Sequence, residues 1–195
     1  MRLSLRGDSI TEKMPWAEFF TPIRNRGIGA EASDGLLRRF DDILKSRPRQ
    51  VFINIGTNDL NFDYQPEFVI ENVRAMLEKI RQDSPQTEAF ICSVLPINLP
   101  ILLEEPGANP VFLKKKANNL PILNAQLRAL AEQNHIPFLD LWPRFADGSG
   151  QLHTDLTVDG THLTIEGKIR YVEAIRSYVK LASDNLAVVT ENIAG

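Results

Sequence analysis

The sequence predicts a three-layer α/β/α fold, in which helices cover both faces of a five-stranded parallel sheet. Short apolar runs, which are typical of buried strands, alternate along the chain with longer segments whose apolar residues recur at helical spacing. Strands separated by helices form parallel sheets, because the chain must cross over between them. The length of 195 residues and a hydrophobic content of 43% fit one domain, 1–195, with a substantial core.

Five short apolar runs are the candidate strands of this sheet. They are residues 3–5, the segment around Ile23, and residues 51–55, 89–95 and 136–141. Pro137 in the last run has no N–H to donate to a neighbouring strand, so this strand is predicted at an edge of the sheet. The single cysteine, Cys92, lies in the fourth run, where we expect a small buried hydrophobic residue.

Four segments carry apolar residues at helical spacing, and we predict a helix in each. They are residues 34–44, 66–82, 120–134 and 164–181. Between the fourth strand and the third helix, residues 96–119 show no clear period and contain four prolines and a glycine. This stretch is a poor helix former. It is interpreted either as an insertion beside the functional site, where it shapes a pocket, or as a disordered surface loop.

Two short motifs at opposite ends of the chain contain the residue types of a serine nucleophile and its base. Ser9 lies in Gly7-Asp8-Ser9, and the second motif is Asp159-Gly160-Thr161-His162. A serine hydroxyl needs an imidazole to take its proton and a carboxylate to orient that imidazole, and His162 and Asp159 can fill these roles from one loop. Either motif alone could equally be a turn or a helix cap.

A third motif follows the strand at residues 51–55 and contains Asn58 in the run Gly-Thr-Asn-Asp. Its amide can donate a hydrogen bond to an oxyanion, although an asparagine in this position can also simply close a turn. In open α/β sheets, sites form beyond the carboxyl ends of the strands. We therefore expect all the motifs at one rim, with Ser9 near a helix N-terminus that favours a developing anion.

At these residues the sequence resembles the SGNH hydrolases, the GDSL-type esterases and lipases. The four family blocks are present in the family's order as Gly7-Asp8-Ser9-Ile10, Asn25-Arg26-Gly27-Ile28-Gly29-Ala30, Gly56-Thr57-Asn58-Asp59 and Asp159-Gly160-Thr161-His162. The resemblance implies a flavodoxin-like fold and a carboxylic ester hydrolase that needs no cofactor. It also implies a Ser9-His162-Asp159 triad that acts through an acyl-enzyme. The oxyanion hole would contain the Ser9 N–H, the Asn58 amide and a backbone N–H of Ala30 or Gly29.

Two residues depart from the family pattern. The glycine that donates to the oxyanion falls on Ala30, with Gly29 one residue earlier. Alanine keeps the N–H but does not easily adopt a positive φ, so either Ala30 has an ordinary conformation or Gly29 is the donor. Arg6 stands where the family usually ends an apolar strand, and its side chain is interpreted as reaching solvent rather than substrate.

The resemblance is nearest to bacterial platelet-activating-factor acetylhydrolases and carbohydrate O-acetylesterases. It implies a short acyl group, acetyl in the first instance, while the alcohol could belong to a sugar, a lipid or another small molecule. Candidate substrate-pocket residues are Asp8, Trp16 and Pro96, although Trp16 is also explained by helix packing. The alternatives are a flavodoxin-like binding or scaffold domain without activity, and a lysophospholipase or thioesterase that acts on longer chains.

Other classes of ligand and partner receive less support from the sequence. His153 and Asp155 could complete a metal site with Asp159 and His162, but the triad explains the latter pair better, so no metal is predicted. A net charge of −3 and a single lysine run, residues 114–116, do not suggest nucleic-acid binding. This run is interpreted as a solvated loop or helix start rather than an anion site. A homodimer is possible.

The sequence also gives an expectation for location. No apolar stretch approaches the roughly 20 residues of a membrane span. Residues 1–5 are too short for a signal peptide. The chain as given is therefore expected to be cytoplasmic, unless it lacks an export signal that the natural protein carries.

Overall fold

A computed structural model describes residues 3–180 and contains a five-stranded, all-parallel sheet in the order β2-β1-β3-β4-β5. The strands are β1 (Leu3–Gly7), β2 (Ile23–Asn25), β3 (Gln50–Asn54), β4 (Glu88–Cys92) and β5 (Phe138–Leu139). The predicted parallel sheet is confirmed. So is the edge position of β5, where Pro137 contributes only its carbonyl, which accepts from the Ile91 N–H at 3.2 Å.

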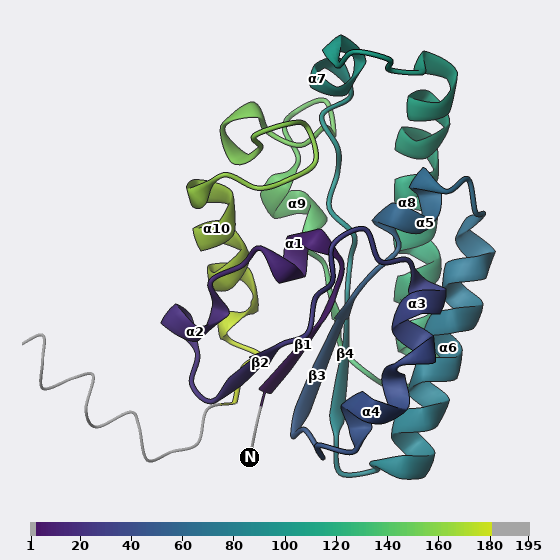
Figure 1. The fold of residues 1–195 in the computed structure, drawn as a ribbon, viewed down its shortest axis with the longest axis vertical. Coiled ribbons are helices and arrows are strands. Elements are labelled where there is room, and N and C mark those ends of the chain that lie inside the picture. The colour runs from purple at the N-terminus through teal and green to yellow at the C-terminus, as the bar shows by residue number, and fades with distance from the viewer. Residues whose placement is uncertain (1–2, 181–195) are drawn as a thin grey trace, which may run out of the picture.

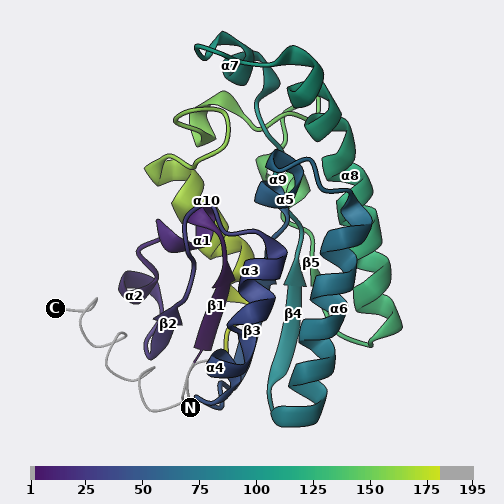
Figure 2. The same ribbon diagram turned by 45° about the vertical axis from the view of Figure 1, so that its right-hand side comes forward.

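Helices cover both faces of this sheet, which confirms the three-layer prediction (Figures 1 and 2). On one face lie α1 (Ser9–Glu12), α2 (Trp16–Phe19), α9 (Trp142–Phe145) and α10 (Ile165–Arg176). On the other lie α3 (Ser33–Arg38), α4 (Phe40–Leu44), α5 (Thr57–Asn61), α6 (Pro66–Asp83) and α8 (Pro110–Gln133). Helix α7 (Leu99–Glu104) and the short 3-10 helix η1 (Thr154–Leu156) lie at the end of the sheet where the strands finish.

Alternate side chains of each central strand point into separate cores. Phe52 and Phe90 stack with ring centroids 4.4 Å apart in the core under α10, whereas Val51, Ile53 and Ile91 enter the core under α6 and α8. Because both faces are apolar, the sheet is buried on both sides, as parallel sheets generally are. Within residues 3–180, no helix is both long and apolar enough to cross a bilayer.

The predicted helices differ from the observed ones in two central places. The segment 34–44 is broken at Arg39 into α3 and α4. The proline-rich stretch 96–119, predicted not to be helical, contains α7 and the first ten residues of α8. Two of its four prolines fall in first turns: Pro100 in α7, and Pro110, which begins α8 after the capping Asn109, whose Oδ1 accepts from two backbone N–H groups. There a missing N–H costs nothing, because no intrahelical partner exists.

The last predicted helix, at residues 164–181, ends earlier than expected. Helix α10 stops at Arg176, and residue 181 lies outside the described residues. Cys92 is a buried free cysteine, as predicted, and burial raises the pKa of its thiol to about 12.

Arg6 contradicts its sequence interpretation, because the side chain does not reach solvent. It is 1% exposed on β1, and its Nε and Nη1 have no hydrogen-bond partner among residues 3–180. Burial, and then the positive charges of Arg39, Arg26 and Arg24, lower its pKa to about 9, while Glu31 opposes this shift. Arg6 pairs with Ile53 in the interior of the sheet, where all five residues of β1 are buried, so its side chain cannot reach water from either face.

Replacing Arg6 with methionine should therefore stabilise the protein. Arg6→Met removes a buried, unpaired charge and keeps an apolar stem of similar length, so we expect the free energy of unfolding to rise by about 1–4 kcal/mol. Urea denaturation at pH 7 measures the change. The control is Arg38→Met on the exposed face of α3, where the change should stay within about 0.5 kcal/mol. A loss of stability in Arg6→Met alone would mean that the guanidinium is paired in solution.

Candidate active site

Ser9, His162 and Asp159 form one continuous hydrogen-bonded chain. Ser9 Oγ lies 2.9 Å from His162 Nε2, and His162 Nδ1 lies 2.6 Å from Asp159 Oδ2. Ser9 begins α1 at the end of β1, while the other two residues lie 150 or more positions later in the loop before α10. A carboxylate can only accept, so Nδ1 carries the proton of a neutral imidazole. Nε2 is then free to accept from the serine hydroxyl.

The loop that holds Asp159 and His162 is a tight turn with internal support. Asp159 Oδ1 accepts from the backbone N–H groups of Thr161 and His162, at 2.9 and 2.7 Å. Gly160 has a φ of 85°, and a Cβ at this position would lie 2.9 Å from the Asn98 carbonyl oxygen. Only glycine fits such a conformation and such a close approach. The Gly160 carbonyl in turn accepts from the Asn98 N–H at 2.8 Å, which ties the turn to the start of α7.

The pKa values of the two carboxylates near Ser9 are shifted in opposite directions. Burial raises the pKa of Asp159, but the hydrogen bonds from His162 and Thr161 together lower it by more than burial raises it. The net pKa therefore lies below its ordinary value. Asp159 is therefore an anion at neutral pH. Asp8 is fully buried, and burial raises its pKa to about 6 although the Ile10 N–H, His162 and Lys116 lower it. Its carboxylate caps α1 by accepting from the Ile10 N–H at 2.9 Å.

The second family block forms the loop between β2 and α3, and it lies against the nucleophile loop. The Ile28 N–H donates to the Gly7 carbonyl at 3.1 Å. Ala30 has a φ of 57°, so the sequence alternative of an ordinary conformation is wrong at this residue. Within residues 3–180, neither the Gly29 N–H nor the Ala30 N–H donates to another residue, so both remain available as donors.

Asn58 and Asp59 fix this loop to α5. The Asn58 Nδ2 donates to the Glu31 carbonyl at 3.1 Å, and the Asp59 carboxylate accepts from the Ser33 N–H at 3.0 Å and from the Ser33 Oγ at 2.5 Å. Gly56, with a φ of 130°, allows the chain to turn from β3 into α5. These contacts bring Asn58 next to Ala30.

A cavity of about 360 Å³ opens beside His162. Its lining consists of Asn61, Leu102, Glu105, Leu113, Lys116, Asp159, Thr161 and His162. The predicted pocket residues Asp8, Trp16 and Pro96 are not part of it. Asp8 and Pro96 are buried beneath the rim, and Trp16 is 2% exposed in the core, where its Nε1 donates to the Thr11 carbonyl at 2.8 Å. The indole of Trp16 is therefore packed in the apolar core and does not line the cavity.

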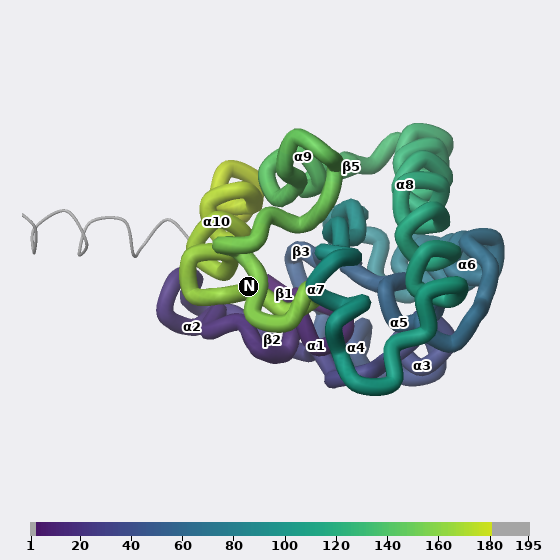
Figure 3. Tube along the Cα trace, turned by 90° about the horizontal axis from the view of Figure 1, so that it is seen from above, coloured from purple at the N-terminus to yellow at the C-terminus, as the bar shows by residue number. Residues whose placement is uncertain are grey.

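Helix α7 and the start of α8 supply this wall, which confirms the interpretation of residues 96–119 as a segment that shapes a pocket, although its individual lining residues were not predicted. Viewed from above, α7 lies beside the loop that precedes α10, and the beginning of α8 lies on the far side of α7 (Figure 3). Residues of all three segments line the cavity. The interpretation of the lysine run as solvated is wrong for Lys116, which is 3% exposed and donates to Asn61 Oδ1 at 2.7 Å. A helical period over residues 110–120 would have placed Lys116 and Leu120 on the buried face.

No metal-binding cluster is present in the described part of the chain. His153 Nδ1 lies 3.8 Å from Asp155, whereas His162 pairs with Asp159. Within residues 3–180, no three His, Cys, Asp or Glu side chains gather closely enough to hold a metal ion.

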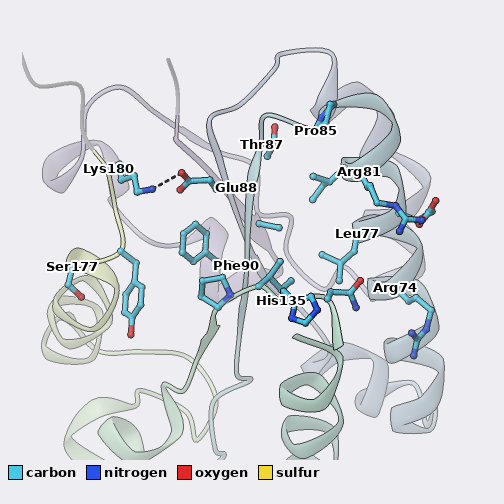
Figure 4. Close-up of a pocket in the computed structure, with 17 residues that line it drawn as sticks. Arg74, Leu77, Arg81, Pro85, Thr87, Glu88, Phe90, His135, Ser177 and Lys180 are labelled. Atoms are coloured by element: carbon cyan, nitrogen blue, oxygen red, sulfur yellow. Dashed lines mark hydrogen bonds and ion pairs between the residues drawn. The ribbon is translucent and has the colours of Figure 1, made fainter. Parts of the chain in front are cut away.

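A larger cavity, of about 800 Å³, lies at the opposite end of the sheet (Figure 4). It is lined by Leu77, Phe90, His135 and Tyr178, among others, and Lys180 pairs with Glu88 at its edge. None of the sequence-predicted site residues reaches it.

The comparison with protein families decides the classification. The GDSL-like lipase/acylhydrolase family matches residues 6–168, which include all the motifs described above. The chain belongs to this family. As a GDSL-like protein it is a carboxylic ester hydrolase, and two similar solved structures are described as a GDSL-like lipase and an acylhydrolase.

Two solved structures from this family are similar over most of their length. A protein described as an acylhydrolase from Bacteroides fragilis is 30% identical, with a TM-score of 0.79, and the match covers 91% of this chain and 85% of that one. A GDSL-like lipase from Bacteroides thetaiotaomicron is 28% identical, with a TM-score of 0.79 and coverage of 91% and 86%.

Curated relatives match over a smaller part of their own length. N-acylneuraminate cytidylyltransferase from Streptococcus agalactiae is 26% identical over 133 residues, which are 67% of this chain. The match spans 28% of that much longer protein.

The left-handed conformation of Ala30 predicts the effect of restoring the family's glycine. A residue with a Cβ in the left-handed region costs about 1–2 kcal/mol. Glycine avoids this cost but loses more chain entropy on folding, which cancels part of the gain. Ala30→Gly should therefore raise the free energy of unfolding by up to ~1 kcal/mol, since the strain is relieved. It should keep kcat for ester hydrolysis close to wild type because the N–H remains. Thermal unfolding and steady-state kinetics measure both.

The matched control is Ala129→Gly, at an exposed position inside α8. Its φ is negative, so glycine relieves no strain there, and this variant should lose about 0.5–1 kcal/mol. Equal losses in both variants would show that Ala30 is not strained.

Proposed function

We propose that Ser9 is the nucleophile of a two-step acyl transfer in which His162 is the general base and Asp159 orients and stabilises the imidazole. The observation that carries this proposal is the unbroken chain of hydrogen bonds from Ser9 Oγ through His162 to Asp159. In this chain the imidazole accepts on Nε2 while the carboxylate holds Nδ1, as nucleophilic activation requires.

In the first step, Ser9 Oγ attacks the ester carbonyl carbon as its proton passes to His162 Nε2. The tetrahedral oxyanion is stabilised by the Asn58 amide, the Ser9 N–H and the Ala30 or Gly29 N–H. His162 then gives the proton to the leaving alcohol, and an acyl-enzyme remains. In the second step, a water attacks the acyl carbon and transfers its proton to His162. The acid leaves as Ser9 recovers its hydrogen.

The proposed substrate is an ester of a short acyl group, acetyl in the first instance. The cavity beside His162 is near the lower end of the size range of ligand pockets, about 300–1,000 Å³. Its walls include Leu102 and Leu113, which limit the length of a bound chain. An acetyl xylan esterase shares the fold at 18% identity, with a TM-score of 0.73, and so supports the fold alone.

Ser9→Ala should abolish ester hydrolysis without loss of stability. The change removes one hydroxyl at the rim, so kcat should fall by at least ~10³, and the midpoint of thermal unfolding should not move. Ser149→Ala, in an exposed turn, is the control and should keep wild-type kcat. A fluorophosphonate probe should label Ser9 in the wild type and leave Ser9→Ala unmodified. Substantial activity in Ser9→Ala would remove the serine mechanism, and an unlabelled wild type would favour a binding domain.

The cavity walls predict a preference for short acyl chains. Along the p-nitrophenyl esters from acetate to octanoate, kcat/KM should be highest for acetate or butyrate and fall for longer chains, which must displace Leu113. Leu113→Ala should move the optimum to longer chains, whereas Val111→Ala, at an exposed position on the same helix, should not. A wild-type optimum at octanoate would favour the longer-chain alternatives.

Acetylated sugars should be tested next, because the p-nitrophenyl esters do not identify the alcohol portion of the natural substrate. O-acetylated N-acylneuraminates belong in this panel because the curated relatives carry that sugar in their name. Acetate release from one sugar class well above the p-nitrophenyl background identifies the natural alcohol.

A further inference from the structure

Lys116 is a buried cation beside the candidate active site, on the first part of α8. Its Nζ donates to the Asn61 Oδ1 at 2.7 Å, where α8 packs against α5. Burial lowers the pKa of its amine to about 8, against the attraction of Asp8, so the amine is mainly protonated at neutral pH. A buried lysine that donates to a neutral amide is unusual, because buried charges are normally paired with a carboxylate.

The amide that Lys116 contacts leads directly to Asn58. Asn61 Nδ2 donates to Asn58 Oδ1 at 3.1 Å, and Asn58 Nδ2 donates to the Glu31 carbonyl at 3.1 Å. Three hydrogen bonds thus run in one direction from the ammonium group to the residue that follows Ala30.

The two ends of this chain fix the orientation of both amides. An ammonium group can only donate, so the Asn61 atom that faces Lys116 must be its oxygen, and its nitrogen faces Asn58. A carbonyl can only accept, so the Asn58 atom that faces Glu31 must be its nitrogen. If Asn58 flipped, its oxygen would face the Glu31 oxygen and its nitrogen would face another nitrogen. The second N–H of the unflipped amide has no acceptor among residues 3–180.

We propose that Lys116 and Asn61 are positioning residues that hold the Asn58 amide with an N–H toward the developing oxyanion and polarise that N–H. Charge-assisted hydrogen bonds are stronger than neutral ones, and successive bonds in a chain strengthen one another. The inference rests on the proposed function, in which Asn58 stabilises the tetrahedral oxyanion. It assigns an electrostatic role to the first turns of α8 that none of the family motifs contains.

Two substitutions test this role without a large change in volume. Lys116→Met removes the charge and suits a buried site. Asn61→Asp still accepts from Lys116 but has no N–H for Asn58 Oδ1, so it favours the flipped Asn58 amide. Each should lower kcat for p-nitrophenyl acetate by about 10-fold or more with little change in KM, because the lost interaction forms mainly in the transition state. If Asn61 merely neutralises and seats Lys116, Asn61→Asp should keep wild-type kcat, and the proposal fails.

A double-mutant cycle separates this role from a general structural one. Asn58→Ala alone should lower kcat by on the order of 10²–10³. In that background, Lys116→Met and Asn61→Asp should have less than a ~2-fold further effect, because their path to the oxyanion is already cut. Undiminished losses in the Asn58→Ala background would overturn the proposal.

The adjacent lysine provides the matched control. Lys115 is half exposed and pairs with Asp63 at 2.6 Å, so Lys115→Met should leave kcat unchanged. Thermal unfolding of each variant shows whether it is folded. If Lys116→Met does not fold, Asn61→Asp alone tests the proposal. Wild-type kcat in Asn58→Ala would discard the proposed oxyanion hole itself. A large loss in Asn58→Ala with wild-type kcat in Lys116→Met and Asn61→Asp would discard only the role of Lys116 and Asn61.

Discussion

The parallel direction of all five strands is the constraint on which the rest of this structure depends. After each of the first four strands, helical segments return the chain to the end of the sheet where the strands begin. Every strand therefore finishes at the opposite end, which forms one rim. Ser9 follows β1, the Ala30 loop follows β2, and Asn58 follows β3. Residues far apart in the sequence thus become neighbours without any long loop having to reach across the molecule. Hydrogen bonds then convert proximity into defined geometry.

Within that rim, buried carboxylates and amides hold the loops through hydrogen bonds. Asp59 binds the backbone and hydroxyl of Ser33, and Asn58 binds the Glu31 carbonyl, so α5 controls the loop after β2. The free energy lost by removing these groups from water is recovered only when each donor and acceptor is paired. Such a network tolerates few alternative arrangements, which is useful where an N–H must point at one spot.

The sequence allowed the sheet, its edge strand and the candidate triad to be predicted, because those features are local: apolar runs, a proline, and short motifs whose order is kept. It could not give the burial of Arg6 and Lys116, since their surroundings come from elements distant in the chain. The helices within residues 96–119 are hidden for another reason. Proline breaks the interior of a helix, but Pro110 follows the capping Asn109 and begins α8. For Trp16 the helix-packing alternative is confirmed, since its ring packs on Phe20, four residues later, and on Tyr171.

The turn at Gly160 ties two parts of the site that could have been separate. Because Gly160 lies against the Asn98 carbonyl and the Leu102 side chain, the helix that forms the wall of the cavity also supports the loop that holds His162. The cavity wall and His162, the proposed general base, are therefore supported by the same contacts. A protein engineer who swaps α7 to admit a bulkier substrate will also displace the imidazole, and must rebuild the Asn98 contact along with the pocket.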